Sequence, residues 1–506
     1  MAYINIPSLN YFNLKFNIVL KNDLNNEDEI FISNSLNHYL SNIKQQIDEY
    51  NSYWDYYKKL TNPYEFIHTQ VPEIKLSICK YKPLSRSFFK MIEIINTFSF
   101  LTEKNTINCF HLAEGPGGFI EAFNYKRNNK GDKYYGMTLI SEDVNIPSWK
   151  KSSHFINNNK NVIIEYGPTK TGDLFKKENL IYCYNMYANS MDYITADGGF
   201  DFSVDFNKQE DLSMKLILSQ IFFAIIMQKE GGNFVLKIFD IFKYKTVEII
   251  FLLANLYDYI YIYKPYTSRI ANSEKYIVCK CYKNNNKNII NDIINNFDYL
   301  LQNIDNIYSL FNLTLPKLFL KKIEEINAIY GQQQIENINN TLNFIREYIN
   351  IKYNNYHLSD SESDEIIDTN LKDNDIISNT GIAELSNILI PLSIPIENTR
   401  DTEFVNELFK LDSVTSTYTS PILNSNTKFS LHNIYNNKSN EFNLIDNDNN
   451  NKDQSFNTNK SLKLLSITNY DKFNNKIQIL KNINIQKSIN WCNKYNFPIY
   501  KHFLNI

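Results

Sequence analysis

Between about residues 80 and 285, short apolar runs alternate with helical patterns. Most of the runs are apolar at successive positions, which is typical of strands in the middle of a parallel sheet that helices cover on both faces. The seven predicted strands are 107–113, 133–139, 162–166, 192–196, 233–238, 259–263 and 275–282. The alternation predicts an α/β fold with a doubly wound, mainly parallel, seven-stranded sheet. Because residues 264–274 are too few for an ordinary crossover helix, we expect an antiparallel edge strand.

The rest of the chain divides by composition into four segments around this domain of residues 81–285. Residues 1–80 and 286–356 have helical patterns and are predicted to be extensions of the domain. Residues 357–480 are acidic and Asn-rich, and we expect them to be largely disordered, because they cannot bury enough apolar surface to offset the entropy of ordering. Residues 481–506 regain apolar and aromatic density, which predicts a C-terminal helical segment packed on the core.

Charge and cysteine content exclude several classes of protein. The net charge of −3 gives no sign that the chain as a whole binds nucleic acid, although it leaves a local basic groove open. The six cysteines contain no C-x-x-C pair, which favours free buried thiols in a reducing compartment over disulfides or a zinc site. There is no signal-peptide pattern, and the most apolar stretch, 216–227, is too short to span a bilayer. We therefore expect a soluble intracellular protein without membrane association, in the cytoplasm, or in the virion or viral factory if the source is viral.

The segment "HLAEGPGGFIEAF" (111–123) places three of the chain's 13 glycines within four positions, between a predicted strand and a predicted helix. Glycine lets the backbone approach a ligand closely, and a helix N-terminus favours negative charge. A strand, a glycine turn and a helix in this order form a common site for nucleotide-like ligands. The alternative is an ordinary tight turn, because GPGG lacks the spacing of G-x-G-x-x-G and of the P-loop.

Four charged residues are predicted to meet at one edge of the sheet. Asp197 ends a buried strand in "YITADGGF", and Lys237 lies near the carboxyl end of "GGNFVLKIFD". Lys90 lies on a helix before the glycine strand, and Glu274 begins the last strand. Ligands bind outside the carboxyl ends of parallel strands, and an antiparallel last strand would present Glu274 at that same edge. Each residue alone also has a structural explanation, such as a turn-forming Asp or a Lys whose ammonium reaches solvent.

In order and spacing these segments resemble the FtsJ/RrmJ-type ribose 2′-O-methyltransferases, whose K-D-K-E tetrad matches Lys90, Asp197, Lys237 and Glu274. The stretches "GPGGF", "GMTL", "ADGGF" and "TSRIANSEKYIVCK" are similar to the cap-specific mRNA branch, which includes eukaryotic enzymes and those of large cytoplasmic DNA viruses. The resemblance covers roughly residues 80–285 and implies a Rossmann-like S-adenosylmethionine-dependent methyltransferase fold. One departure is His111, where many members carry Asp, and Glu114 is expected to take over part of that role.

The resemblance implies S-adenosyl-L-methionine as methyl donor, no metal, and transfer to the ribose 2′-hydroxyl of the first transcribed nucleotides of capped mRNA. The donor-binding residues that it implies are Glu114, Gly115, Pro116, Gly117, Gly118, Phe119, Asp173 and Asp197. Asp173 has the alternative role of capping the helix that follows it. Lys237 is the expected base or hydroxyl-activating group, with Lys90 as its electrostatic partner and the two carboxylates as positioning groups. A second cation and partial burial push a lysine towards its neutral form, whereas carboxylates push the other way.

Arg86 and Arg269 flank the tetrad in "SRSFF" and "TSRIAN" and are candidates to hold RNA phosphates, or else to form structural ion pairs. The expected partner is capped RNA, with other capping or transcription proteins as partners of the C-terminal tail, and the sequence leaves the oligomeric state open. The alternatives are methylation of ribosomal or transfer RNA, and a non-catalytic cap- or RNA-binding module with the same fold.

Overall fold

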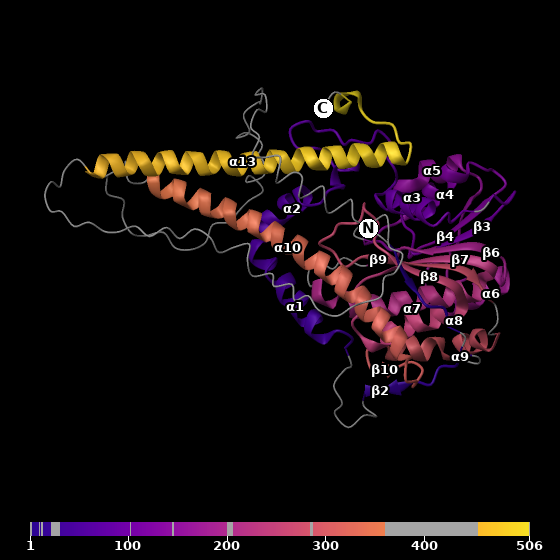
Figure 1. The fold of residues 1–506 in the computed structure, drawn as a ribbon. Helices are drawn as coiled ribbons and strands as arrows, with labels where there is room; N and C mark the ends of the chain where they lie inside the picture. The colour runs from indigo at the N-terminus through magenta and orange to yellow at the C-terminus, as the bar shows by residue number, and fades with distance from the viewer. Residues whose placement is uncertain are drawn as a thin grey trace, which may run out of the picture. The chain divides into compact units, whose positions relative to one another are not determined.

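In the computed structural model of the chain, the predicted sheet lies between two layers of helices (Figure 1). The structure describes residues 3–9, 11, 14–21, 31–101, 103–143, 146–199, 206–283, 287–359 and 454–504. By its internal contacts the chain divides into two units, one of Met1–Tyr348 with Asn475–Ile506 and one of Ile349–Asn474. The sheet and the candidate site belong to the first unit. In the second unit the structure describes only residues 349–359 and 454–474. These belong to two helices, α10 (Lys317–Ser359) and α13 (Gln454–Lys494), whose other residues lie in the first unit.

The sheet has eight strands in the order β1-β8-β9-β7-β6-β3-β4-β5. Their bounds in that order are Ile4–Ile6, Tyr257–Tyr263, Lys275–Tyr282, Gln228–Ile238, Met191–Ala196, Asn108–Leu112, Lys133–Met137 and Val162–Ile164. The strands from β7 to β5 run parallel, which confirms the predicted fold class. β9 runs antiparallel between β7 and β8, so the antiparallel strand predicted from residues 275–282 lies inside the sheet. The antiparallel edge is an eighth strand, β1, which pairs with β8 and is too short to give a periodic signal.

Helices cover both faces of the sheet (Figure 1). On one face lie α3 (Ser87–Thr97), α4 (Gly118–Arg127) and α5 (Ser153–Asn158), and on the other lie α6 (Lys177–Tyr187), α7 (Gln209–Met227) and α8 (Tyr244–Leu256). α7 is buried almost all round because α9 (Lys287–Asn303) packs outside it, and it accordingly shows no polar face. A two-stranded sheet of β2 (Val19–Leu20) and β10 (Ile307–Ser309) lies apart from the main one. Within the part of the chain that the structure describes, no helix has the length and apolar composition needed to cross a bilayer.

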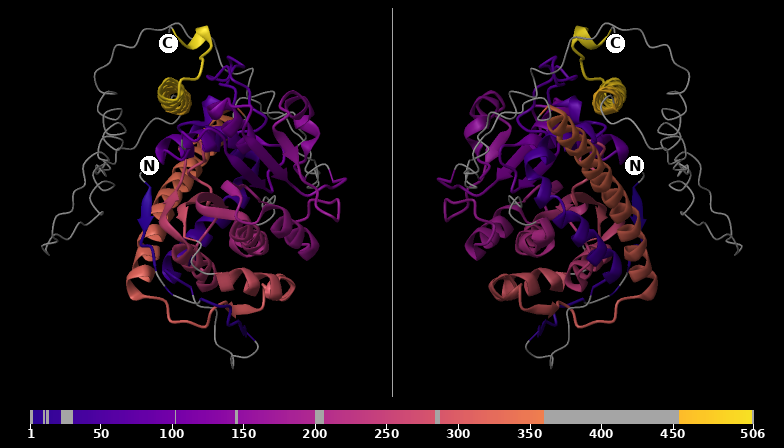
Figure 2. Two further views of the ribbon diagram at one scale, coloured as in Figure 1. Left: turned by 90° about the vertical axis from the view of Figure 1, so that its right-hand side faces the viewer. Right: turned by 90° about the vertical axis from the view of Figure 1, so that its left-hand side faces the viewer.

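The N-terminal segment packs against α10 through its two helices, α1 (Asn34–Gln45) and α2 (Asn51–Leu60), as Figures 1 and 2 show. The Thr61 and Thr341 hydroxyls are hydrogen-bonded at 2.6 Å, and Asn337 donates to the carbonyl of Thr61 at 3.0 Å. Apolar residues of α10 at helical spacing are buried, including Ile338 and Leu342 at 0% exposure. The N-terminal segment is therefore fixed to the same unit as the sheet.

The C-terminal helix α13 is longer than the sequence pattern suggests. Its buried positions include Asn484 and Ser488, which interrupt the apolar periodicity, so only the aromatic end is recognisable from sequence. Near that end Trp491 packs edge-on against Phe89 of α3, with ring centroids 5.5 Å apart. The backbone then pairs Ile499 with Cys79. The predicted disordered segment, 357–480, falls mostly on residues 360–453, which lie outside the described residues. The division into domains at residues 80, 285, 356 and 480 stays a prediction.

Replacing Trp491 by Ala should lower the free energy of unfolding by about 3–5 kcal/mol, because truncating a buried aromatic ring leaves a cavity. Urea denaturation followed by circular dichroism measures the change. Leu504→Ala is the matched control, because Leu504 is 62% exposed and its truncation should cost no more than about 0.5 kcal/mol. Equal stability of the two variants would contradict the packing of this segment on α3.

Candidate active site

Two parallel strands bring Asp197 and Lys237 together. β6 ends at Ala196 opposite Leu236 of β7, so the next residue of each strand lies at the carboxyl edge of the sheet. The Lys237 ammonium donates to the backbone carbonyl of Asp197 at 2.6 Å and lies 3.4 Å from its carboxylate oxygen Oδ1. Gly199 leaves room for this ammonium, since a Cβ there would lie 3.0 Å from Lys237 Nζ. Both side chains are mostly buried, at 13% exposure each.

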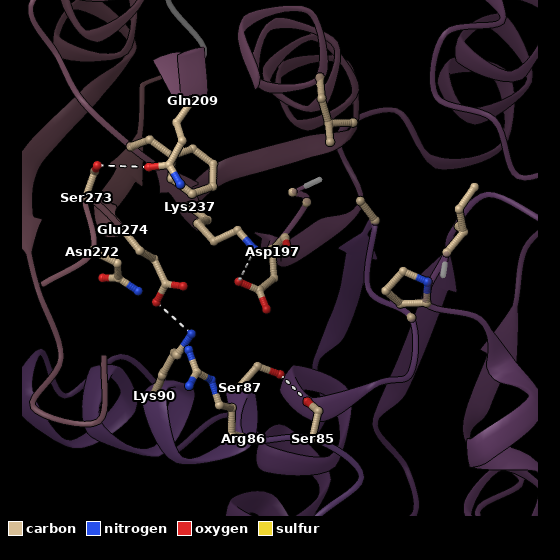
Figure 3. Close-up of a pocket in the computed structure, with 18 of the residues that line it drawn as sticks. Ser85, Arg86, Ser87, Lys90, Asp197, Gln209, Lys237, Asn272, Ser273 and Glu274 are labelled. Carbon is tan, nitrogen blue, oxygen red and sulfur yellow. Dashed lines mark hydrogen bonds and ion pairs between the residues drawn. The ribbon is translucent and has the colours of Figure 1, made fainter. Parts of the chain in front are cut away.

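Lys90 and Glu274 reach the same place from opposite directions, as Figure 3 shows. β9 runs antiparallel to β7, with Tyr276 opposite Lys237, so the residue before β9 lies at the carboxyl edge of its parallel neighbours. Lys90 projects from α3, and its ammonium lies 2.6 Å from Glu274 Oε1. The four predicted tetrad side chains therefore form two ion pairs that line one cavity.

Burial and charge act in opposite directions on the Lys90–Glu274 pair. Burial alone would raise the pKa of Glu274, but the cations of Lys90, Lys237 and Arg86 outweigh it and hold that pKa below the usual range of a glutamate. For Lys90, burial lowers the pKa, and the charge of Glu274 opposes this shift. Glu274 is therefore ionised at neutral pH and holds the ammonium of Lys90 in place.

Tyr276 and Glu93 belong to the same site, although the sequence did not single them out. The Tyr276 hydroxyl donates to Asp197 Oδ1 at 2.9 Å and lies 3.4 Å from Glu274 Oε1, so it bridges the two carboxylates. The two-residue period of a strand could have indicated Tyr276, because it puts Tyr276 on the same face as Glu274. Buried Glu93 of α3 accepts the backbone N–H groups of Tyr266 and Thr267 at 2.7 and 2.8 Å, which fixes the loop that leads to Glu274.

The tetrad lines a cavity of about 900 Å³, which lies within the range of roughly 300–1,000 Å³ for ligand sites. One wall, here called the first wall, follows the ends of β3, β4 and β5 and comprises Ala113, Gly115, Pro116, Thr138, Leu139, Gly172, Asp173, Leu174 and Phe175. The other, here called the second wall, comes from α1, α2, the residues between them and α10, and comprises Lys44, Ile47, Trp54, Lys58 and Gln334. The cavity is thus lined both by the sheet edge and by helices outside it.

Residues 83–282 match the FtsJ-like methyltransferase family. The cap-specific mRNA (nucleoside-2′-O-)-methyltransferase of Autographa californica nuclear polyhedrosis virus is 32% identical over 234 residues, which cover 45% of this chain and 85% of the viral protein. The chain belongs to the FtsJ-like methyltransferase family.

Two nematode proteins, both from Caenorhabditis briggsae, are also similar to the chain. The cap-specific mRNA (nucleoside-2′-O-)-methyltransferase 1A is 32% identical over 243 residues, which cover 44% of this chain and 27% of the relative. The inactive cap-specific mRNA (nucleoside-2′-O-)-methyltransferase 1B is 30% identical over 243 residues, which cover 44% of this chain and 28% of the relative. The chain therefore spans only about a quarter of the length of these two relatives.

In this FtsJ-like chain the glycine turn has both structural and lining residues. Gly117 has a φ of +105° and is the N-cap of α4, and a Cβ on Gly118 would lie 2.2 Å from the hydroxyl oxygen of Ser87. Within the described turn, Gly115 and Pro116 line the cavity, whereas Glu114, Gly117, Gly118 and Phe119 do not. Glycine is therefore required at position 117 by the backbone conformation and at position 118 by the close packing of α4 on α3.

His111 of β3 and Glu114 of the glycine turn are both buried. His111 is buried with its Nδ1 2.8 Å from the Thr195 hydroxyl, and burial lowers the pKa of its imidazole to about 3, so it is neutral. Glu114 Oε1 accepts the backbone N–H of Phe119 at 2.5 Å, but Oε2 is buried without a hydrogen-bond partner among the described residues. Burial raises the pKa of Glu114 well above its ordinary value.

Asp173 lines the cavity, and its carboxylate accepts the backbone N–H of Phe175 at 2.8 Å. The alternative in which it caps the following helix is wrong, because α6 begins at Lys177 and its N-cap is Lys176. The Asp173 carboxylate instead stabilises the turn before that helix.

The two candidate RNA-binding arginines differ in their surroundings. Arg86 is half-buried in the cavity, and its guanidinium makes no hydrogen bond or ion pair with any other residue that the structure describes. Arg269 lines the cavity but donates from Nε and Nη2 to buried Glu65, at 2.9 and 2.6 Å. It therefore forms the structural ion pair that was the alternative to binding an RNA phosphate. Burial would raise the pKa of Glu65, but the charge and hydrogen bonds of Arg269 hold it below its usual range.

Replacing Glu65 by Gln should destabilise the protein by about 3 kcal/mol or more at pH 7, because it leaves the charge of Arg269 without its buried partner. A depressed folded pKa contributes stability that is present above the ordinary value of 4.5 and is lost as the pH falls through the folded pKa. The difference between wild type and variant in urea denaturation should therefore shrink below about pH 4.5. Exposed Glu178→Gln is the control, with no such difference at either pH.

Proposed function

We propose that the chain is an S-adenosylmethionine-dependent RNA ribose 2′-O-methyltransferase that acts on the first transcribed nucleotides of capped mRNA. The observation that carries the proposal is the cluster of Lys90, Asp197, Lys237 and Glu274 in two ion pairs at the edge of a large cavity. Membership of the FtsJ-like family supports methyl transfer as the reaction. The names of the baculovirus and nematode relatives support the 2′-hydroxyl of capped mRNA as the acceptor.

The first wall is the proposed donor site. Gly115 and Pro116 present backbone at the cavity, and Asp173 supplies a carboxylate on the same wall. Buried Glu114 Oε2 has no partner among the described residues, so a cationic group of the donor's methionine part would satisfy it. When bound, S-adenosylmethionine supplies an electrophilic methyl group on a positively charged sulfonium, which the nearby carboxylate of Asp197 would help to balance.

The tetrad would activate the acceptor. A ribose hydroxyl is a poor nucleophile at neutral pH and needs a positioned base or an ordered set of charges. Lys237, held by the carbonyl and carboxylate of Asp197, would contact the 2′-hydroxyl as its base or as its orienting cation. Lys90, held by Glu274, would stabilise negative charge that develops on the attacking oxygen. Tyr276 would orient the carboxylate of Asp197 by donating a hydrogen bond to it.

Lys237→Ala should lower methyl transfer by about 10²–10⁴-fold, because it removes the group that activates the hydroxyl. The affinity for S-adenosylmethionine, measured by titration calorimetry, should stay near that of wild type. Lys229→Ala is the matched control, since Lys229 lies on the same strand, away from the cavity, with a half-exposed side chain. Activity of Lys237→Ala within a few fold of this control would contradict the assignment.

The two alternatives predict different substrates or no turnover. The inactive relative, at 30% identity, makes a non-catalytic module a specific alternative. Radiolabelled methyl transfer to short RNAs of one sequence, capped and uncapped, followed by nuclease mapping of the product, distinguishes them. The proposal expects a 2′-O-methylated first nucleotide on capped RNA only. Equal labelling of uncapped RNA would favour ribosomal or transfer RNA, and binding of capped RNA without turnover would indicate the non-catalytic module.

A further inference from the structure

The second wall of the cavity lies outside the segment that matches the family. That match begins at residue 83, whereas Lys44, Ile47, Trp54 and Lys58 come from α1, α2 and the residues between them. Trp54 and Lys58 are four residues apart on α2, so they lie on the same face of that helix. The family comparison therefore assigns nothing to this part of the cavity.

The wall is held rigidly. The C-terminal end of α2 is fixed by the hydrogen bond of Thr61 to Thr341 of α10, and Asn484 of α13 donates to the carbonyl of Leu60 at 2.5 Å. Trp54 is 7% exposed and forms apolar backing beside Lys58. A ligand that binds here meets a preformed surface, which lowers the entropy cost of binding.

Most cations of the cavity are already neutralised by a buried carboxylate. These pairs are Lys44 with Asp240, Lys90 with Glu274, Lys237 with Asp197, and Arg269 with Glu65. Arg86 has no hydrogen bond or ion pair with a described residue, as noted above.

Lys58 is the other lining cation without a buried partner, because among the residues that the structure describes it pairs only with Asp55, whose side chain is 77% exposed. An exposed pair of this kind contributes about 0–1 kcal/mol, so a stronger anion can replace it. The whole chain has a net charge of −3. The cavity nevertheless presents two cations, Arg86 and Lys58, that an anionic ligand can contact.

We propose that α2 forms part of the RNA-binding site, with Lys58 binding a backbone phosphate of the RNA on the second wall, together with Arg86. The inference rests on the proposed function, because it takes RNA as the occupant of this side of the cavity. The anion is a phosphodiester of the strand that carries the acceptor ribose. Asp55 holds Lys58 in the free protein, and the phosphate takes its place in the complex.

The test compares Lys58→Ala with Lys59→Ala, a neighbouring lysine that does not line the cavity. Binding of a short capped RNA is measured by fluorescence anisotropy over a range of salt concentrations, and methyl transfer gives kcat and KM. Lys58→Ala should raise the Kd for RNA about tenfold at low salt, because it removes a charge-assisted contact. The slope of the log of the association constant against log salt, which is negative, should become shallower by about 0.7, as expected for one lost phosphate contact. The KM for RNA should rise with little change in kcat or in donor affinity, and Lys59→Ala should match wild type.

Asp55→Asn is the second variant, and it separates phosphate binding from a structural role of the Lys58–Asp55 pair. If Lys58 binds phosphate, removing the competing carboxylate should leave RNA binding unchanged or tighten it, whereas loss of a structural pair would weaken it in both variants. If wild type methylates RNA but Lys58→Ala has the same Kd and salt slope as Lys59→Ala, this inference is overturned and the proposed function is not. A folded wild type that binds the donor but neither binds nor methylates any RNA would overturn the proposed function and this inference with it.

Discussion

The candidate active site depends on one strand that runs against its neighbours. Parallel strands all end at the same edge of a sheet, so a strand inserted in the opposite direction begins there. The antiparallel pairing of β9 with β7 puts Glu274 beside Lys237 and Lys90. Had β9 run parallel, its eight residues at about 3.3 Å each would have placed Glu274 roughly 26 Å away, at the far edge. Strand direction therefore decides whether the four side chains form one site.

The site concentrates buried charge and neutralises it in pairs. Burying an ion pair is rarely the most stable arrangement, because the desolvation of both charges offsets much of their attraction. What the pairs achieve is position: each ammonium is held at a defined point by a carboxylate that is itself hydrogen-bonded. Glu274 illustrates this, since it accepts from the Ser268 hydroxyl at 3.0 Å as well as pairing with Lys90. Such pre-organisation is what catalysis by ordered charges requires.

The N-terminal segment is joined to the site by the same kind of contact. Lys44 of α1 donates to Asp240 at 2.8 Å and to the hydroxyl of Ser273 at 3.3 Å, next to Glu274. Glu65 holds Arg269 on the loop that leads to the same residue. These contacts link the start of the chain to the turn before β9. The segment that precedes the family match is thus part of the environment of the tetrad.

Local patterns were enough to predict the α/β fold class, the seven strands of 107–282 and the order of the tetrad residues, three of them at strand ends and Lys90 on a helix, because strand periodicity and motif order are local properties. Tertiary structure decided the rest. β1 has only three residues, too few to show a period. In α13 the buried polar residues Asn484 and Ser488 interrupt the apolar pattern by which a helix is predicted. The partner of Arg269 lies 204 residues away, and Tyr276 gained its role only from the register of β9 on β7. Contacts between residues so far apart leave no trace in local patterns, so the second wall and the pairing of the charges became visible only in the folded chain.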